Sequence, residues 1–194
     1  METGHNLEPI LGILVAIASH LISVLVLYRL GQVVFRDASL ALVAASLHIF
    51  SPAGLFLSAP YAESTFSLLS FTGHLLFAES CRKARRPGSR DALILLAGVS
   101  FGLATVFRSN GVLNGVFFAW QFVRQLARLL RYPTDAVRRL IVLGIGGLCV
   151  AAGLIAPQLV AYQRFCLAGP GAELRPWCQS YLPSIYNFVQ QHYW

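Results

Sequence analysis

Two ionisable side chains stand at the edges of apolar stretches, where they could take part in chemistry. Glu63 follows the Ala59-Pro60 break, and Arg108 precedes Ser109-Asn110-Gly111. Charged groups inside or beside lipid are costly and mark a function or a partner, and backbone broken by Pro or Gly can line a polar cavity there. Two interpretations remain open. Arg108 could hold an anion such as a phosphate while Glu63 orients hydroxyl groups or pairs with Arg108, or the two could form only a structural ion pair at the membrane surface.

Histidines and cysteines provide a second set of reactive groups. His20, His48 and His74 fall in three different apolar stretches and lack the i, i+3 or i+4 spacing of a preformed helical metal site. We therefore predict interhelical hydrogen bonds for them and no metal site. Cys166 and Cys178 lie in the C-terminal segment, where an oxidising compartment would allow a disulfide. Two unpaired thiols are the alternative.

The composition places these groups in a membrane protein. Of 194 residues, 56% are hydrophobic and 12% are charged, whereas a soluble domain carries about 25% charged residues. The net charge of +7 is spread over the flanks of apolar runs and does not form the continuous basic surface of a nucleic-acid-binding protein. We therefore predict an all-α, polytopic transmembrane helical bundle that does not bind nucleic acid.

The apolar runs predict about six spans, since crossing a bilayer takes about 20 residues. The spans lie near residues 9–28, 38–59, 61–78, 91–107, 111–123 and 140–163. Ser51-Pro52 should end or kink the second span early, and residues 31–37 and Arg82–Arg90 should be connections. Residues 1–164 then form one transmembrane region, and residues 165–194 form an extramembrane or interfacial segment of the same single, incomplete domain.

The basic residues predict the orientation of this bundle. Of the 15 Lys and Arg residues, all except Arg108, Arg164 and Arg175 lie at the connections that follow the first, third and fifth spans. By the positive-inside rule these connections are cytoplasmic. Both chain ends, Glu63 and Arg108 should therefore lie on the opposite side of the membrane.

Six segments, in a fixed order, carry a family resemblance from about residue 10 to the end. They are Phe50-Ser51-Pro52-Ala53-Gly54-Leu55-Phe56-Leu57-Ser58-Ala59, Tyr61-Ala62-Glu63-Ser64-Thr65-Phe66, Ala104-Thr105-Val106-Phe107-Arg108-Ser109-Asn110-Gly111, Gln163-Arg164-Phe165-Cys166, Pro176-Trp177-Cys178, and Pro183-Ser184-Ile185-Tyr186 through Tyr193-Trp194. The sequence resembles the PIG-V family of GPI mannosyltransferases, multi-pass enzymes of the GT-C type. The joined Tyr-x-Glu and Arg-Ser-Asn-Gly elements are the most specific part.

The resemblance implies an activity and a compartment. Such an enzyme transfers the second mannose, in α-1,6 linkage, from dolichyl-phosphate mannose to the GPI precursor in the lumen of the endoplasmic reticulum, without a metal, a cofactor or a soluble nucleotide sugar. A carboxylate would accept the proton of the acceptor 6-hydroxyl, and Arg108 could stabilise the departing phosphate. Some members require a small membrane partner subunit. The candidate substrate-binding residues are Tyr61, Glu63, Arg108, Ser109, Asn110 and Trp177.

The sequence also departs from the family pattern. The family opens with a lumenal loop that bears Trp-Asp and a following Phe-Phe-Pro element, where the catalytic Asp is expected, and it continues beyond Tyr193-Trp194. We therefore expect this chain to correspond to the middle of the enzyme and to be inactive alone. The catalytic residue stays unknown, because the expected Asp lies outside this sequence. A transporter or a structural subunit of a membrane complex is the alternative. Transporters usually show two related halves and charges near the bilayer midplane, and this sequence has no repeat.

Overall fold

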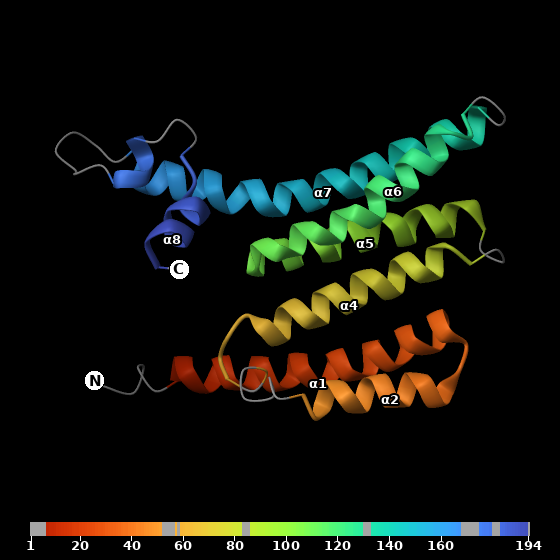
Figure 1. The fold of residues 1–194 in the computed structure, drawn as a ribbon, viewed down its shortest axis with the longest axis horizontal. Coiled ribbons are helices and arrows are strands. Elements are labelled where there is room, and N and C mark those ends of the chain that lie inside the picture. The colour runs from red at the N-terminus through yellow and green to blue at the C-terminus, as the bar shows by residue number, and fades with distance from the viewer. Residues whose placement is uncertain are drawn as a thin grey trace.

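The computed structural model describes residues 7–51, 57, 59–82, 86–129, 133–167, 175–179 and 183–193. Within these residues the chain forms helices and no β-strand (Figure 1), which confirms the predicted all-α fold class. The helices are α1 (Leu7–Phe35), α2 (Ala38–Ile49), α4 (Glu63–Ser80), α5 (Pro87–Phe107), the 3-10 helix η1 (Ser109–Asn114), α6 (Gly115–Leu126), α7 (Pro133–Phe165), the 3-10 helix η2 (Pro176–Gln179) and α8 (Ile185–Tyr193).

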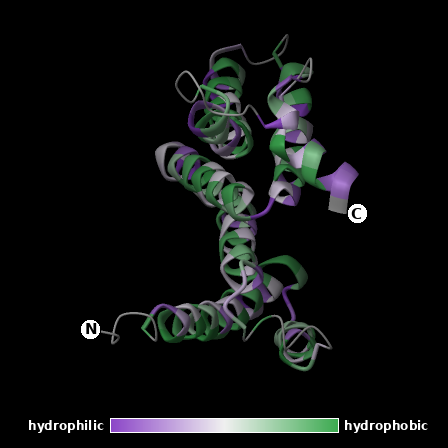
Figure 2. Ribbon diagram, turned by 90° about the vertical axis from the view of Figure 1, so that its left-hand side faces the viewer, coloured by the Kyte–Doolittle hydropathy of each residue, from purple (hydrophilic) through white to green (hydrophobic). Residues whose placement is uncertain are grey.

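Three of the described helices, α1, α5 and α7, are long and apolar enough to cross a membrane. Their outward faces carry large hydrophobic side chains, such as Leu25 at 68% and Leu148 at 69% exposure. Figure 2 shows hydrophobic residues, in green, along most of the length of the helices. A surface of this kind is suited to lipid, because monomeric soluble proteins rarely expose large continuous apolar patches. The helices therefore fit a membrane protein.

The number of spans stays a prediction. α2 and α6 have 12 residues each, so each is about 18 Å long, against about 30 Å for the hydrocarbon core. α4 has 18 residues but contains Ser, Thr, Glu and His, and it does not count among the three long apolar helices.

The helices pack as a row (Figure 1). α1 contacts α2 and α4, α4 contacts α5, and α5 contacts α7, which in turn contacts α6. Successive connections alternate between the two ends of this row. One end, which we call the Glu63 end, carries residues 59–63, 108–114, 175–179 and 183–193. The other, the arginine end, carries residues 35–38, 80–90 and 124–139 in so far as these are described.

The predicted connection over residues 31–37 is wrong in its extent, because α1 continues to Phe35. The turn itself is short. Arg36 takes a positive φ of 57°, which ends α1. The carboxylate of Asp37 then accepts a 2.7 Å hydrogen bond from the amide of Ser39 and caps α2. α1 and α2 therefore form a tight helical hairpin.

Proline sets three of the other boundaries. α2 ends at Ile49, ahead of Ser51-Pro52, as expected. The predicted polar loop Arg82–Arg90 is too long, because α5 already begins at Pro87. α7 begins at Pro133, inside the region expected to be a basic connection. A proline at the first helical position loses no hydrogen bond, since that amide has no partner within the helix.

Some sequence predictions fall on residues that the structure does not describe. They concern Pro52 through Phe56, Ser58, Lys83, Arg85, Arg131 and Trp194.

Glycines bring α5 and α7 into backbone contact. A Cβ at Gly98 would lie 2.6 Å from the Cα of Gly146, and one at Gly153 would collide with the carbonyl oxygen of Gly102. Small residues allow this close approach in membranes, where van der Waals contact replaces the hydrophobic effect as a driving force. The crossing also fixes Arg108, which follows directly after α5.

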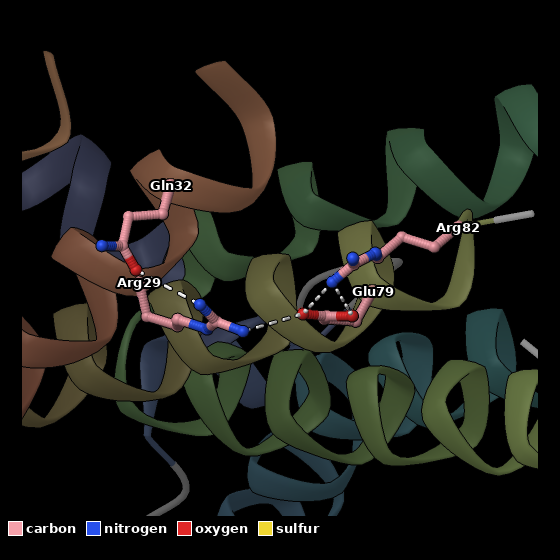
Figure 3. A network of polar contacts seen from close by, with 4 residues as sticks. All are labelled: Arg29, Gln32, Glu79 and Arg82. Atoms are coloured by element: carbon pink, nitrogen blue, oxygen red, sulfur yellow. Dashed lines mark hydrogen bonds and ion pairs between the residues drawn. The ribbon is translucent and has the colours of Figure 1, made fainter. Parts of the chain in front are cut away.

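A charged network ties α1 to α4 at the arginine end (Figure 3). Glu79, 8% exposed, accepts two 3.2 Å hydrogen bonds from Nη1 of Arg82. Nη2 of Arg29 lies 3.8 Å from the same carboxylate, and Nη1 of Arg29 donates to Gln32. A buried carboxylate is stable only when it is paired in this way. The network therefore fixes the separation of the two helices at this end.

Candidate functional site

Glu63 and Arg108 meet at the end of the bundle. Glu63 is the first residue of α4, and Arg108 is the C-terminal cap of α5. Nη1 of Arg108 donates a 2.6 Å hydrogen bond to Oε1 of Glu63. A carboxylate at a helix N-terminus and a cation at a helix C-terminus both complement the helix dipoles. The ion pair therefore joins two adjacent helices at a position that favours both charges.

Arg108 stays accessible in this arrangement. Its side chain is 40% exposed and that of Glu63 is 33% exposed. The guanidinium carbon lies 5.8 Å from the ring centroid of Phe66, which follows Glu63 by three residues and so shares its face of α4. Among the described residues, Glu63 is the ion-pair partner of Arg108, and it uses one of five N–H donors. The guanidinium is thus oriented and can still bind an anion.

The 3-10 helix η1 fixes Ser109 and Asn110 beside Arg108. The amide of Gly111 donates a 2.8 Å hydrogen bond to the carbonyl of Arg108. A Cβ at Gly111 would lie 2.7 Å from the Cα of Thr105, so the turn packs directly on α5 and leaves no space for a side chain. Asn110 is exposed and Ser109 is half-buried. Both polar side chains are therefore held within one turn of the guanidinium.

The start of α4 is held by hydroxyl groups that the sequence did not single out. The fully buried Ser64 donates its Oγ hydrogen to the carbonyl of Leu57. Thr65 forms a 3.4 Å hydrogen bond with Ser19 of α1. Their signal in the sequence was weak, because Ser and Thr are common in membrane helices. These bonds position Glu63.

Tyr61 and Trp177 are the remaining predicted site residues. Tyr61 precedes Glu63 by two residues and is 59% exposed. Trp177 lies in η2 and is 5% exposed. A disulfide joins Cys166 to Cys178 with Cα atoms 5.5 Å apart, and it brings η2 to the end of α7. In the described residues, the hydrogen bonds and ion pairs of Glu63 do not extend to Trp177.

A second tether holds the C-terminal segment. Nε2 of Gln158 on α7 donates to Oγ of Ser184, and Oε1 of the same side chain accepts from the amide of Ile185, at 3.1 and 3.0 Å. Ser184 also caps α8 through the amide of Asn187. The segment is thus fastened to α7 at two points.

The three histidines hydrogen-bond within the bundle or pack against aromatic rings. Nε2 of His48 lies 3.3 Å from Oγ of Ser23 across α2 and α1, which confirms an interhelical bond there. His74 instead bonds the carbonyl of Ser70 in its own helix, at 2.7 Å, so that part of the prediction is wrong. His20 and His48 have ring centroids 5.2 Å apart. The described residues contain no group of three or more His, Cys, Asp or Glu that could hold a metal ion.

Comparisons with known proteins agree with one another. Residues 6–194 match the family model described as Mannosyltransferase (PIG-V). A GPI mannosyltransferase 2 of Chaetomium globosum is 57% identical over 205 residues, which cover 96% of this chain and 44% of that relative. The proteins of the same name from Gibberella zeae and Aspergillus oryzae are each 43% identical, over 96% and 98% of this chain and 44% and 46% of their own lengths. The chain thus spans less than half the length of these relatives. No solved structure matches.

Proposed function

The chain belongs to the PIG-V mannosyltransferase family, and on this basis we propose that it takes part in the second mannose transfer of GPI-anchor biosynthesis. The donor is dolichyl-phosphate mannose, the acceptor is the GPI precursor, and the reaction occurs on the lumenal side of the endoplasmic reticulum membrane. The observation that carries the proposal is the oriented, accessible Arg108 at the Glu63 end. The distribution of the arginines supports a lumenal location for this end.

The chemistry is an inverting displacement at the anomeric carbon of mannose. The 6-hydroxyl oxygen of the acceptor forms the new bond, and the bond from the anomeric carbon to the phosphate oxygen breaks. The hydroxyl proton passes to a carboxylate base, expected on the family's Trp-Asp loop, which this sequence does not contain. Dolichyl phosphate leaves with one more negative charge than it carried in the donor.

Arg108 would act on this developing charge. Glu63 and Phe66 hold the guanidinium in place, so little reorganisation is needed when charge appears on the phosphate. The interaction accelerates transfer only in so far as it is stronger in the transition state than in the bound donor. Ser109 and Asn110 lie close enough to Arg108 in the chain to bind other oxygens of the phosphate or the sugar.

The two aromatic candidates have different roles in this proposal. Tyr61 is exposed and can contact a sugar or a lipid phosphate. Trp177 is buried, and a ring that stacks on a sugar must present a free face, so we assign it to the docking of η2. Cys166 and Cys178 serve the same end through their disulfide.

The membrane context supplies the remaining partners. Both substrates are lipid-linked, so they reach the site laterally within the bilayer, and both chain ends lie in the lumen. A small membrane subunit, as in some relatives, is part of the proposal. The transporter and structural-subunit alternatives gain no support from the family match.

Complementation tests the proposal. Cells that lack GPI mannosyltransferase 2 receive this chain within its full-length protein, and surface GPI-anchored protein is measured. We expect rescue by the full-length protein and loss of rescue by Arg108→Ala. Arg164→Ala, which removes an exposed arginine from the last turn of α7, should rescue fully. Failure of the unmodified full-length protein, expressed at normal level, would exclude this activity.

A further inference from the structure

Two cavities adjoin at the arginine end, opposite the Glu63–Arg108 pair. Each has a volume of about 290 Å³. They share four lining residues, which come from α5, from the end of α6 and its following turn, and from α7: Arg90, Gln125, Arg128 and Arg139. We call the two cavities together the arginine pocket. A water molecule occupies about 30 Å³, so each cavity has room for a polar group of several heavy atoms.

The carboxylates of the pocket do not balance its positive charge. Asp91 pairs with Arg138, with Oδ2 and Nη2 2.6 Å apart, and Asp135 also lines the first cavity. Among the described residues, Arg90, Arg128 and Arg139 form no ion pair.

Those three arginines line both cavities. Nε of Arg90 donates a 3.2 Å hydrogen bond to the carbonyl of Ser80, which holds that group in the pocket wall. Arg90 and Arg139 are half-buried. Like charges repel more strongly where water is partly excluded, and an anion placed between them would reverse the sign of the interaction. The pocket is therefore electrostatically suited to an anion.

A buried amide points to the same conclusion. Gln125 is 4% exposed and lines both cavities. The amide nitrogen and oxygen form no hydrogen bond within the described part of the chain and are not fully enclosed, so they are accessible from the cavities. The NH₂ group of an amide carries two donors, which would suit the oxygens of a phosphate between the guanidinium groups.

An apolar groove begins where the pocket ends. It is shallow and widely open, has a volume of about 560 Å³, and is lined by Pro133, Thr134, Val137, Ile141 and Val142, together with Arg138, which also lines the pocket. Val137 and Ile141 are 46% and 57% exposed. A site with a cationic end and an adjoining apolar groove fits an amphiphile with an anionic head. It does not fit a free inorganic ion, which would leave the groove unused.

We propose that the arginine pocket binds the phosphate head group of an anionic phospholipid, with an acyl chain of that lipid in the apolar groove on α7. Arg128, Arg139 and the amide of Gln125 contact the phosphate oxygens. Guanidinium groups suit this task because they form paired, charge-assisted hydrogen bonds to phosphate, and basic pockets between membrane helices on the cytoplasmic side bind such head groups. This site is separate from the proposed transfer site and holds a structural lipid.

The test is a binding titration on the detergent-solubilised full-length protein. Phosphatidic acid is the probe, and phosphatidylcholine with the same acyl chains, inorganic phosphate and glycerol 3-phosphate are the comparison arms. The variants are Arg128→Gln/Arg139→Gln and the charge-preserving Arg128→Lys/Arg139→Lys. The matched control is Arg164→Gln, which lies on α7 like Arg139. Each arginine near an anionic head group contributes about a fivefold factor, so we expect the double glutamine variant to bind phosphatidic acid about 25-fold more weakly.

The wild-type protein and Arg164→Gln should bind phosphatidic acid tightly and phosphatidylcholine at least about tenfold more weakly, and the double lysine variant should recover part of the lost affinity. An unchanged elution profile shows that the variants are folded. If the double glutamine variant does not fold, the single variant Arg128→Gln replaces it in the titration. Equal affinity of the wild-type and glutamine variants would overturn the proposal. Tight binding of the soluble phosphates, with no gain from acyl chains, would overturn the lipid assignment.

Discussion

The sharpest prediction concerns the loss of Arg108 in the full-length enzyme. Arg108→Ala removes the guanidinium that lies 2.6 Å from Glu63, and Glu63→Gln keeps the guanidinium but removes the charge that orients it. If Arg108 stabilises the leaving phosphate, its removal should lower the turnover rate by about 100- to 1,000-fold, as for the loss of one preorganised donor to a developing anion. Glu63→Gln should cost about tenfold, because the donor remains but is less well aligned.

The exposure of the two side chains determines what to expect if the ion pair is purely structural. The two side chains are 33% and 40% exposed, so solvent screens them and their mutual attraction should contribute about 0.2–1 kcal/mol to stability. The loss of a purely structural pair would therefore lower the amount of folded protein and leave the rate per folded molecule nearly unchanged. The two interpretations thus differ by more than tenfold in the measured rate.

The assay is transfer of labelled mannose from dolichyl-phosphate mannose to the GPI precursor, in membranes from cells without their own activity. Rates are divided by the amount of folded protein, measured from its elution as a single species. Arg108→Ala should lower kcat more than it raises KM, and the double variant should be no slower than Arg108→Ala alone, because Glu63 acts through Arg108. A loss of less than about fivefold for Arg108→Ala, or equal losses for both single variants, would refute the phosphate role.

Three further predictions concern the bundle itself. Gly153→Ala should destabilise the α5–α7 crossing by about 1–3 kcal/mol, because the new Cβ meets the backbone of Gly102. Gly147→Ala is the control and should be tolerated, since the nearest atom to its Cβ is 3.9 Å away. The thermal unfolding midpoints of the two variants are compared in detergent, and equal midpoints would contradict this packing. Glu79→Gln should cost about 1–2 kcal/mol by the same measurement, and an unchanged midpoint would show that its network is dispensable. Cys178→Ser removes a disulfide of sequence separation 12 and should lower the free energy of unfolding by about 3 kcal/mol, because the unfolded chain regains loop entropy. The C-terminal segment should then be the first part cut in limited proteolysis. An unaltered cleavage pattern would show that Gln158 alone holds the segment.

The sequence determined the fold class, because local composition decides whether a chain lies in lipid. Apolar runs with few charges need no knowledge of tertiary contacts to be recognised as membrane helices. The break at Ser51-Pro52 was visible for the same reason, since proline acts through its own backbone. The extent of α1 was not visible, because Gly31 and Gln32 interrupt the apolar run, whereas in the structure Gly31 packs against Ala41 within a continuous helix.

The candidate site was likewise determined partly by the sequence and partly by the tertiary structure. Glu63 and Arg108 stood out in the sequence because charge beside lipid is costly wherever it occurs. The sequence left their pairing as one of two interpretations, and the tertiary structure shows that they pair across 45 positions. The close approach of Gly102 and Gly153, and the gathering of Arg90, Arg128 and Arg139 around Gln125, were decided by tertiary structure alone. Each depends on which faces of separate helices meet, and spacing along one helix carries no information about the rotation and offset of its neighbour.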